Sequence, residues 1–484
     1  MAVILHRNDL RVSDNPAVNK PRTAQPIYIF DPVQWESPMF SPQRKQFVLE
    51  SLTDLKRQYD EQNGDLAFFH GDTKEILSDL ASQHDIIFNN DANHFRQGLE
   101  ADLRDGYNGV EQGATQYSGR DTRTWSEQAM NWFTDEPITP ETVFEEHVDG
   151  NTSLEAMRQR YGESTDKEHF GEGGRRAALQ RLETFKHRID HYAAHISPPA
   201  KAEQMTSHLS PYIRYGCISV REVYAAFKDL DGSNAEQFKD RLVWHQHFQQ
   251  KLEDNPDLYE EAINPVYRGL NNDNHESHLI QAWKNGRTGY PLVDASMRAL
   301  KQTGWMNFRM RAMTASFYSY ILKQWWKTGA DHFYKHLIDA DVAINYYQWQ
   351  MQSGLVGVHA NRIYNPTKQV KDNDPNGIYI KRYVPELRNI PSDKIARPWR
   401  LTPEEQQRYG VILGEDYPNP IIDFDKEART ARAYFKRKAP EAYEAFNDDT
   451  VWEKASLSSR HSRDDIREKA KEKQPTLKEF SDSP

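Results

Sequence analysis

Residues 337–352, LIDADVAINYYQWQMQ, combine residue types that rarely meet in a packed interior. Asp339 and Asp341 open the segment, apolar residues follow, and Asn345 stands four positions before Trp349. Carboxylates among apolar residues cost free energy unless another group pairs with them. The segment therefore predicts a charged partner or a polar ligand facing these side chains.

A basic partner for these carboxylates stands about thirty residues upstream. Arg309 and Arg311 lie at the start of a predicted buried helix, whose apolar residues are Phe308, Ala312, Ala315, Ile321, Leu322, Trp325 and Trp326. A buried arginine and a buried carboxylate need each other, so we predict an Arg311–Asp339 pair. The pair alone is compatible with a structural ion pair or with a functional site.

A cluster of hydroxyl groups precedes another predicted helix, in TSHLSPYIRYG at residues 206–216. Ser210 before Pro211 has the pattern of an ordinary helix N-cap. Thr206 and Ser207 exceed what a cap requires. Hydroxyls gathered where a helix exposes free backbone N–H groups suit an anion or a phosphate, so a cap and a phosphate cradle are both open interpretations.

Four tryptophans flank the same region: Trp305, Trp325, Trp326 and Trp349. Tryptophans usually pack in a core. Indole rings at near contact also relay electrons to a redox cofactor, and spacing alone does not decide between the two roles.

The elements that must position these groups divide the chain in two. Short apolar runs, VILHR, PIYIF, DLAFFHG and DIIFNN, predict buried parallel strands, and Val48, Leu52, Leu55 and Tyr59 mark a helix between them. We predict an α/β domain with a parallel, Rossmann-like sheet at 1–130, a polar connector at 131–174, an all-helical domain at 175–452 and a charged tail at 453–484.

Composition narrows the class of protein. The net charge of −10 over 484 residues does not indicate a general nucleic-acid binder, although a local basic groove would suffice for one. The single cysteine, Cys217, excludes an intramolecular disulfide and a multi-cysteine metal site, and we expect no metal. The start of the chain is not a secretory signal, and no apolar run reaches the ~20 residues of a membrane span. We expect a cytoplasmic, intracellular monomer.

Several segments together resemble the photolyase/cryptochrome family of blue-light flavoproteins. They are HRNDLRVSDNPAV at 6–18, TSHLSPYIRYGCIS at 206–219, WKNGRTGYPLVDASMRAL at 283–300, GWMNFRMRAMTASF at 304–317, LIDADVAIN at 337–345 and RIYNPTKQ at 362–369. The resemblance covers nearly the whole chain in family order. It implies an antenna-type α/β domain and a helical domain that holds FAD in a folded conformation.

The resemblance also assigns roles to the residues above. Tyr192 and the loop of Thr206, Ser207, His208, Leu209 and Ser210 match the FAD-phosphate region. Asp339 and Asp341 match the acidic pair beside the flavin and ribose, with Arg311 as ion-pair partner.

Asn345 matches the residue that faces flavin N5, where an amide donates a hydrogen bond without adding negative charge. Trp349 and Trp326 match the proximal and middle tryptophans of the electron relay.

Other positions depart from the family pattern. The distal relay tryptophan aligns near Asp273, so the relay must end elsewhere, at Trp325 or a tyrosine, or be shorter. In dimer-repairing members a Glu stands three residues before the lesion-pocket tryptophan, whereas here Arg241 precedes Trp244. A second pocket tryptophan is replaced by Met351 and a pocket Asn by Phe308.

Further chemistries of the family fit less well. The two histidines of a (6-4) photolyase align with Asn307 and Arg311, and the lone cysteine excludes the iron–sulfur branch.

The resemblance implies a DNA photolyase that splits pyrimidine dimers in UV-damaged DNA by electron transfer from excited reduced flavin. The alternatives are a cryptochrome-type photoreceptor with little or no repair activity and a flavin-free scaffold. Candidate DNA-phosphate contacts are Arg309, Arg362, Lys368 and Lys371. The antenna chromophore is open: a folate, a deazaflavin, a flavin or none.

One short motif lies in the tail. QPTLKEF, from Gln474 to Phe480, resembles a sliding-clamp-binding peptide, with Ser481 where a second aromatic usually stands.

Overall fold

The amino-terminal strands form because short apolar runs are buried on both faces. All five residues of β1, Ala2–His6, are buried, and β1 pairs in parallel with β2, Thr23–Phe30, and β4, Asp85–Asn89. The sheet order is β3-β2-β1-β4-β5, with β6 also paired to β2. The remaining strands are β3 Ala67–His70, β5 Asn108–Val110 and β6 Val143–Phe144. The prediction of a parallel sheet is confirmed.

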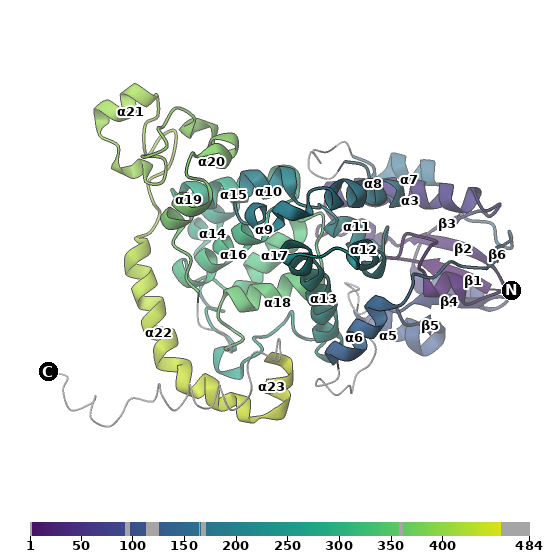
Figure 1. Cartoon of the computed structure of the whole chain (residues 1–484). Helices are drawn as coiled ribbons and strands as arrows, with labels where there is room; N and C mark the ends of the chain where they lie inside the picture. The colour runs from purple at the N-terminus through teal and green to yellow at the C-terminus, as the bar shows by residue number, and fades with distance from the viewer. Residues whose placement is uncertain are drawn as a thin grey trace.

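The structure is a computed structural model that describes residues 2–91, 97–112, 125–163, 165, 171–357 and 362–455. Helices cover both faces of the sheet in the α/β part, at the right of Figure 1. They are α1 Pro16–Asn19, α2 Pro32–Trp35, α3 Pro42–Asp60, α4 Thr73–Ala81, α5 Gln97–Gly106, α6 Trp125–Thr134 and α7 Leu154–Tyr161.

The predicted helical face of α3 is buried. Val48, Leu52, Leu55 and Tyr59 are each at most 2% exposed, as their spacing predicts. Within the stretch predicted as a connector, β6 extends the sheet and α7 packs against α3.

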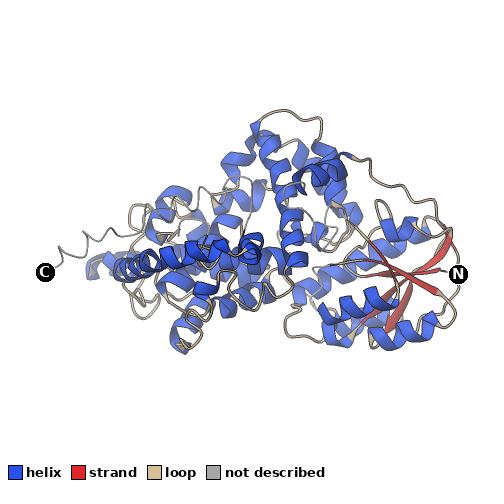
Figure 2. Cartoon of the chain, turned by 90° about the horizontal axis from the view of Figure 1, so that it is seen from below, coloured by secondary structure: helices blue, strands red, loops and turns tan. Residues whose placement is uncertain are grey.

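The remainder of the described chain is helical: in Figure 2 the red strands are confined to the end of the molecule near the N-terminus. Its first elements are α8 Arg175–Lys186, η1 Ile189–His191, α9 Tyr192–His195, α10 Pro199–Met205, α11 Ser210–Arg214, α12 Val220–Phe227, α13 Ser233–Asp254, η2 Pro265–Tyr267, α14 Ser277–Lys284 and α15 Pro291–Thr303.

The later elements complete this helical domain. They are α16 Phe308–Ser316, η3 Phe317–Ile321, α17 Trp326–His336, α18 Val342–Gln352, α19 Pro366–Asn373, α20 Ile378–Tyr383, η4 Pro385–Leu387, η5 Pro398–Arg400, α21 Pro403–Tyr409, α22 Phe424–Glu444, η6 Ala445–Asn447 and α23 Asp449–Ala455. In the described part of the chain, no helix has the length and apolar character needed to cross a membrane.

One of the buried hydrophobic clusters spans both domains. Apolar residues of the sheet, such as Ile4 and Phe30, belong to the same buried cluster as Tyr212 and Phe227 of the helical domain. At the junction the buried carboxylate of Asp14 accepts hydrogen bonds from Arg221 and Ser219.

The chains of the two domains also touch directly at Gly216. The backbone N–H of Leu10 donates to Tyr215 O at 3.0 Å. Gly216 has φ +63°, and a Cβ there would lie 2.4 Å from Asn8 O, so glycine satisfies both the turn and the close approach. The segment that begins HRNDLRV therefore joins the domains.

The prediction of one continuous helix over 308–326 is wrong. The helix ends in η3, Lys323 adopts φ +52°, and α17 begins anew at Trp326. Hydrogen bonds to residues outside the helix stabilise the break. Asn274 Nδ2 donates to Lys323 O at 2.6 Å, and the backbone N–H of Glu276 donates to Gln324 Oε1 at 3.0 Å. Phe308, predicted to be buried, is 51% exposed because it lies in the first turn of α16.

Candidate functional site

The two carboxylates of the segment 337–352, Asp339 and Asp341, lie between the end of α17 at His336 and the start of α18 at Val342. Asp341 caps α18, because its Oδ1 accepts from Ile344 N at 2.8 Å. Asp339 Oδ1 and Oδ2 lie 3.1 and 2.9 Å from Arg311 Nη2. The predicted ion pair between Arg311 and Asp339 is therefore present, and it ties α16 to this turn.

Ser210 connects the hydroxyl loop to the same carboxylate. Its Oγ donates to Asp339 Oδ2 at 2.7 Å. The interpretation of Ser210 as an N-cap is wrong: Leu209 holds the cap position of α11, and Ser210 is the first helical residue. The Ser210 hydroxyl instead donates to a buried carboxylate, a charged acceptor that needs hydrogen bonds.

The loop between α10 and α11 turns sharply at His208, whose φ is +50°. The His208 ring lies 3.0 Å from Glu203 O through Nε2 and 4.8 Å from the Trp305 ring. A non-glycine residue in this region stores strain, which ordered structures tolerate mainly at functional sites. Thr206 Oγ1 donates to Ala202 O at 2.7 Å, so the loop is anchored to α10.

A cleft of about 610 Å³ adjoins this loop. Thr206, Ser207 and His208 line it, together with Arg181 and Arg188 from the α8 side. Neither Asp339 nor Asp341 lines this cleft. The hydroxyl loop thus lines the cleft with Thr206, Ser207 and His208. It contacts the acidic turn through Ser210.

Asn345 and Trp349 share one face of α18, four residues apart. Asn345 Nδ2 donates to Ala330 O at 3.0 Å, which leaves a second amide hydrogen for another acceptor. The Trp349 Nε1 atom is buried without a hydrogen-bond partner in the part of the chain that the structure describes. Gly329 of α17 lies directly against the indole, because a Cβ there would meet Trp349 ring carbons at 2.4 and 2.6 Å.

Tyr192 lies against Arg241. Burial raises the pKa of Tyr192, and the Arg241 guanidinium, which hydrogen-bonds the phenol, opposes part of that shift. The Tyr192 ring also packs against Phe238 at 5.5 Å. Arg241, which replaces the expected Glu of the lesion pocket, is thus engaged with Tyr192 of the predicted FAD-phosphate region.

The predicted lesion-pocket residues are only partly covered. Trp244 and Met351 are half-buried, with the Trp244 ring 6.0 Å from Phe248 and 5.6 Å from His247. Phe308 is exposed, and Arg309 of the same helix stacks over Tyr364 at 5.8 Å.

The basic residues proposed for phosphate contact lie on the surface. Arg362, Lys368 and Lys371 are exposed, and Lys368 Nζ is 2.5 Å from Asp372. These positions leave the cations accessible to an external anion.

The two tryptophans predicted to form the relay, Trp349 and Trp326, are both buried, and each contacts other rings. Trp349 lies 5.0 Å from Phe333, 5.9 Å from Tyr318 and 6.0 Å from Trp283. The Trp326 ring lies 6.3 Å from Tyr346. Trp325 is the N-cap residue of α17, and Asp273 is an exposed carboxylate.

The sequence did not predict three residues near Asp341: Gln249, Arg214 and His245. Gln249 Nε2 donates to Asp341 Oδ2 at 2.8 Å, and Arg214 Nε donates to Ala340 O at 2.9 Å. Burial, the largest influence, lowers the pKa of His245, while the nearby Asp341 carboxylate opposes the shift. The available signal for two of them was the i, i+4 spacing of His245 and Gln249 on one side of α13, which packs against α18.

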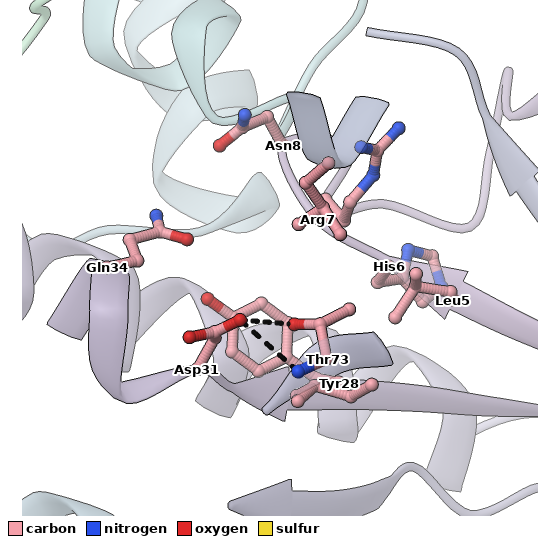
Figure 3. Close-up of a pocket in the computed structure, with 10 residues that line it drawn as sticks. Leu5, His6, Arg7, Asn8, Tyr28, Asp31, Gln34 and Thr73 are labelled. Atoms are coloured by element: carbon pink, nitrogen blue, oxygen red, sulfur yellow. Dashed lines mark hydrogen bonds between the residues drawn. The ribbon is translucent and has the colours of Figure 1, made fainter. Parts of the chain in front are cut away.

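A second, smaller pocket lies where β1 and β2 end (Figure 3). Asp31 Oδ2 accepts from Thr73 Oγ1 at 2.7 Å, and Arg7 binds Glu100 at 2.5 Å and Asn89 O at 2.7 Å. The carboxyl ends of parallel strands are the usual place for a ligand. This pocket has a volume of about 30 Å³. A drug-sized ligand needs roughly 300 Å³ or more, so a flavin or folate does not fit here as the side chains stand.

Two further predictions concern other parts of the chain. Among the residues that the structure describes, no three His, Cys, Asp or Glu side chains gather as a metal site. The clamp-like peptide, Gln474 to Phe480, lies outside the described residues.

Comparisons with known proteins point to one family. The chain matches the family model of DNA photolyase over residues 2–113 and that of the FAD-binding domain of DNA photolyase over 238–437. It is 39% identical to a deoxyribodipyrimidine photo-lyase of Alkalihalophilus pseudofirmus, over 54% of this chain and 55% of that protein. It is 29% identical to a cryptochrome DASH of Gloeobacter violaceus, over 90% and 95%.

Solved structures agree with this result. A class III photolyase from Agrobacterium tumefaciens superposes with a TM-score of 0.78 at 27% identity, covering 92% of this chain and 97% of that one.

The donor set suits FAD, the cofactor of the matched domain. Hydroxyls and backbone N–H groups suit phosphates, carboxylates suit ribose hydroxyls, and the unpaired Trp349 Nε1 and second Asn345 amide hydrogen remain for polar ring atoms. Fold, site and comparisons agree, and the chain belongs to the photolyase/cryptochrome family of FAD-binding proteins.

Proposed function

We propose that this protein is a light-driven DNA repair flavoenzyme, a photolyase that splits pyrimidine dimers in UV-damaged DNA. The observation that carries the proposal is the buried amide of Asn345 on the wall that α18 forms. This helix also carries Trp349, and its first turn follows the acidic pair. An amide at this place favours an electron-rich reduced flavin, which is the donor that repair needs.

The hydrogen-bond network suggests how the FAD is held. Ser207 and the backbone N–H groups of the loop would bind the phosphates where α11 begins, while Thr206 and Ser210, whose hydroxyls already donate to Ala202 O and Asp339, would hold the loop in shape. Tyr192 would border the same region.

The acidic turn would bind the other part of the cofactor. Asp339, fixed by Arg311, and Asp341, fixed by Gln249, would face the flavin edge and the ribose. Because their partners hold both carboxylates in place, the site is organised before the cofactor binds.

FAD, when bound, supplies the one-electron chemistry of the reaction. Asn345 would donate its second amide hydrogen toward flavin N5 without placing a negative charge beside it. Trp349 would pass an electron inward, and Trp326 would supply Trp349. Burial of both indoles excludes water from this route.

DNA would approach over the half-buried rim of Trp244 and Met351. A dimer stacks poorly, so flipping it out of the duplex costs only a few kcal/mol. Trp244, Met351, Phe308 and Arg241 would contact the lesion. Arg309, Arg362, Lys368 and Lys371 would contact phosphates, which allows binding despite the net charge of −10.

A repair assay tests this proposal. Reduced, FAD-loaded protein is illuminated with single- and double-stranded oligonucleotides that contain one thymine dimer, beside a dark control. We expect dimer loss only in the light, and we expect Asn345→Asp to lose most of it because the added charge opposes the reduced flavin. Dimers that persist in both substrates would sink the proposal.

A cryptochrome-type photoreceptor is the second candidate. The observation in its favour is Arg241, which binds Tyr192 where dimer-repairing members carry Glu, next to Met351 in place of a stacking tryptophan. Light-dependent flavin reduction without repair of either substrate would favour this candidate.

The tail peptide from Gln474 to Phe480 would serve either candidate as a clamp-binding segment. The double substitution Leu477→Ala and Phe480→Ala should abolish retention on an immobilised sliding clamp. Retention of the double variant would remove this partner.

A further inference from the structure

The electron relay of this chain lacks its outer tryptophan. At the aligned position stands Asp273, a surface carboxylate that does not donate electrons. An oxidised Trp326 would take the electron back from the reduced flavin unless another group supplies an electron first. The chain therefore needs a different outer donor, and this need rests on the proposed function.

The rings behind Trp349 form a closed inner cluster. Trp283 and Tyr318 are fully buried, and Phe333 is 1% exposed. The Trp283 Nε1–H donates to the backbone carbonyl of Thr314 at 3.2 Å. A backbone carbonyl accepts a hydrogen bond but does not take up the proton of an oxidised indole. An oxidised Trp283 therefore cannot be stabilised by losing its proton to this partner.

Tyr346 lies on the other side, in contact with Trp326. Their ring centroids are 6.3 Å apart and nearly perpendicular, at 83°. Tyr346 also stands three residues before Trp349 on α18, so both rings lie on neighbouring positions of one helix face. Tyr346 thus contacts Trp326 and stands about one helical turn from Trp349.

The phenol of Tyr346 has what the inner cluster lacks, a carboxylate base. Its hydroxyl donates to Asp331 Oδ1 at 2.7 Å. The Asp331 side chain is 37% exposed, so a proton that arrives there can pass to water. Lys327 Nζ lies 3.2 Å from the same carboxylate and holds it in place.

Burial, reinforced by the adjacent Asp331 charge, raises the pKa of Tyr346, so the phenol is protonated before oxidation. A neutral tyrosine releases an electron readily only if its proton leaves at the same time. The Asp331 contact meets that requirement without a rearrangement.

We propose that Tyr346 is the outer electron donor of this protein and that Asp331 is its proton acceptor. Trp349 would give an electron to the light-excited oxidised flavin, and Trp326 would refill Trp349. Tyr346 then gives one electron to oxidised Trp326 and its phenolic proton to Asp331. The products are neutral Trp326, a neutral tyrosyl radical and a protonated Asp331, and an external thiol later returns a hydrogen atom to the radical.

Two neighbouring tyrosines supply controls. Tyr259 and Tyr334 both lie 5.9 Å from the Tyr346 ring. Neither donates to a carboxylate in the part of the chain that the structure describes, so both lie beside Tyr346 but lack its base. Tyr259 is the better control because it is half-buried, whereas Tyr334 packs under Arg44.

The test is electron paramagnetic resonance of the FAD-loaded protein, frozen after a light flash without thiol. Wild type should show a tyrosyl radical whose signal narrows when tyrosine is ring-deuterated. Tyr346→Phe and Asp331→Asn should each reduce the signal at least tenfold and slow flavin photoreduction by a similar factor. Tyr259→Phe should leave both unchanged, and thermal unfolding of each variant checks that it is folded.

A tyrosyl signal that survives in Tyr346→Phe, or one that disappears in Tyr259→Phe, would overturn the proposal. So would a wild type that reduces its flavin in light while forming only tryptophan radicals. Failure of the proposed function looks different, because wild type would then bind no FAD or leave dimers unrepaired whichever radical forms.

Discussion

At the scale of single residues, the site depends on a few contacts that join distant segments. Ser210, Arg311 and Asp339 come from three different elements and meet in one hydrogen-bonded group. None of the three stabilises its own helix end. Their arrangement is therefore better explained by a site that must hold its shape than by local helix chemistry.

Replacement of Asp339 by Asn should leave Arg311 without its counter-charge. Because Asp339 is buried and Arg311 is one-quarter exposed, we expect a loss of about 2 kcal/mol in the free energy of unfolding, below the full value of a deeply buried pair. Urea unfolding of the apoprotein measures it, and FAD content should also fall. Lys368→Ala is the control, since its exposed pair with Asp372 contributes less than ~1 kcal/mol. Equal stability of Asp339→Asn and wild type would contradict the account.

Gly329 is a second residue with a specific steric role. A helical Gly→Ala change normally gains up to ~1 kcal/mol. Here the new methyl would overlap the buried Trp349 ring, so overpacking should outweigh that gain and destabilise the protein by about 2 kcal/mol. Gly98 in α5 is the matched control, because nothing lies within 4 Å of its added Cβ. Chemical unfolding of both variants measures the difference, and a stabilised Gly329→Ala would refute the contact.

At the scale of elements, α17 carries more than Trp326. His332 and His336 lie one turn apart, with tilted rings whose centroids are 4.5 Å apart, beside several lysines. Burial, followed by the charges of Lys335 and Lys301, lowers the pKa of His336 to about 4. Both rings must stay neutral while α17 is packed.

This pair predicts a pH dependence of stability. The folded pKa of His336 lies below the unfolded value of about 6.5, so the unfolded chain binds more protons in the window between pH 6.5 and 4. Stability should fall as pH falls through that window. Between pH 7 and pH 5, His336→Gln should reduce this loss by about 2 kcal/mol, measured by urea unfolding at both values. An identical pH profile for wild type and variant would show that His336 is not buried as described.

The sequence predicts the strands and α3 well, because apolar runs and helical spacing follow directly from burial. It also predicts the Arg311–Asp339 pair, since an unpaired buried charge is costly. It misses the break at Lys323, which depends on Asn274, a residue far away in the chain. It wrongly predicts a helix cap at Ser210, because the acceptor of the Ser210 hydroxyl, Asp339, lies in another segment. Contacts set by tertiary packing leave no local pattern.

At the scale of the whole molecule, the two domains behave as one folded unit. They share a buried hydrophobic cluster, and Asp14 in the first domain binds Arg221 and Ser219 in the second. The pocket at the strand ends is too small for a flavin or folate as it stands, so FAD in the helical domain is the chromophore that this account requires. The net charge of −10 confines any DNA contact to a local patch.

The central claim is that residues 206–210 and 337–352 hold a flavin that Trp349 reduces in light. The most direct measurement is the absorption spectrum of the purified protein, before and after blue light with a thiol. We predict one FAD per chain, bleached by light in wild type and at least tenfold more slowly in Trp349→Phe. A colourless protein that takes up no FAD, or bleaching that is independent of Trp349, would contradict the account.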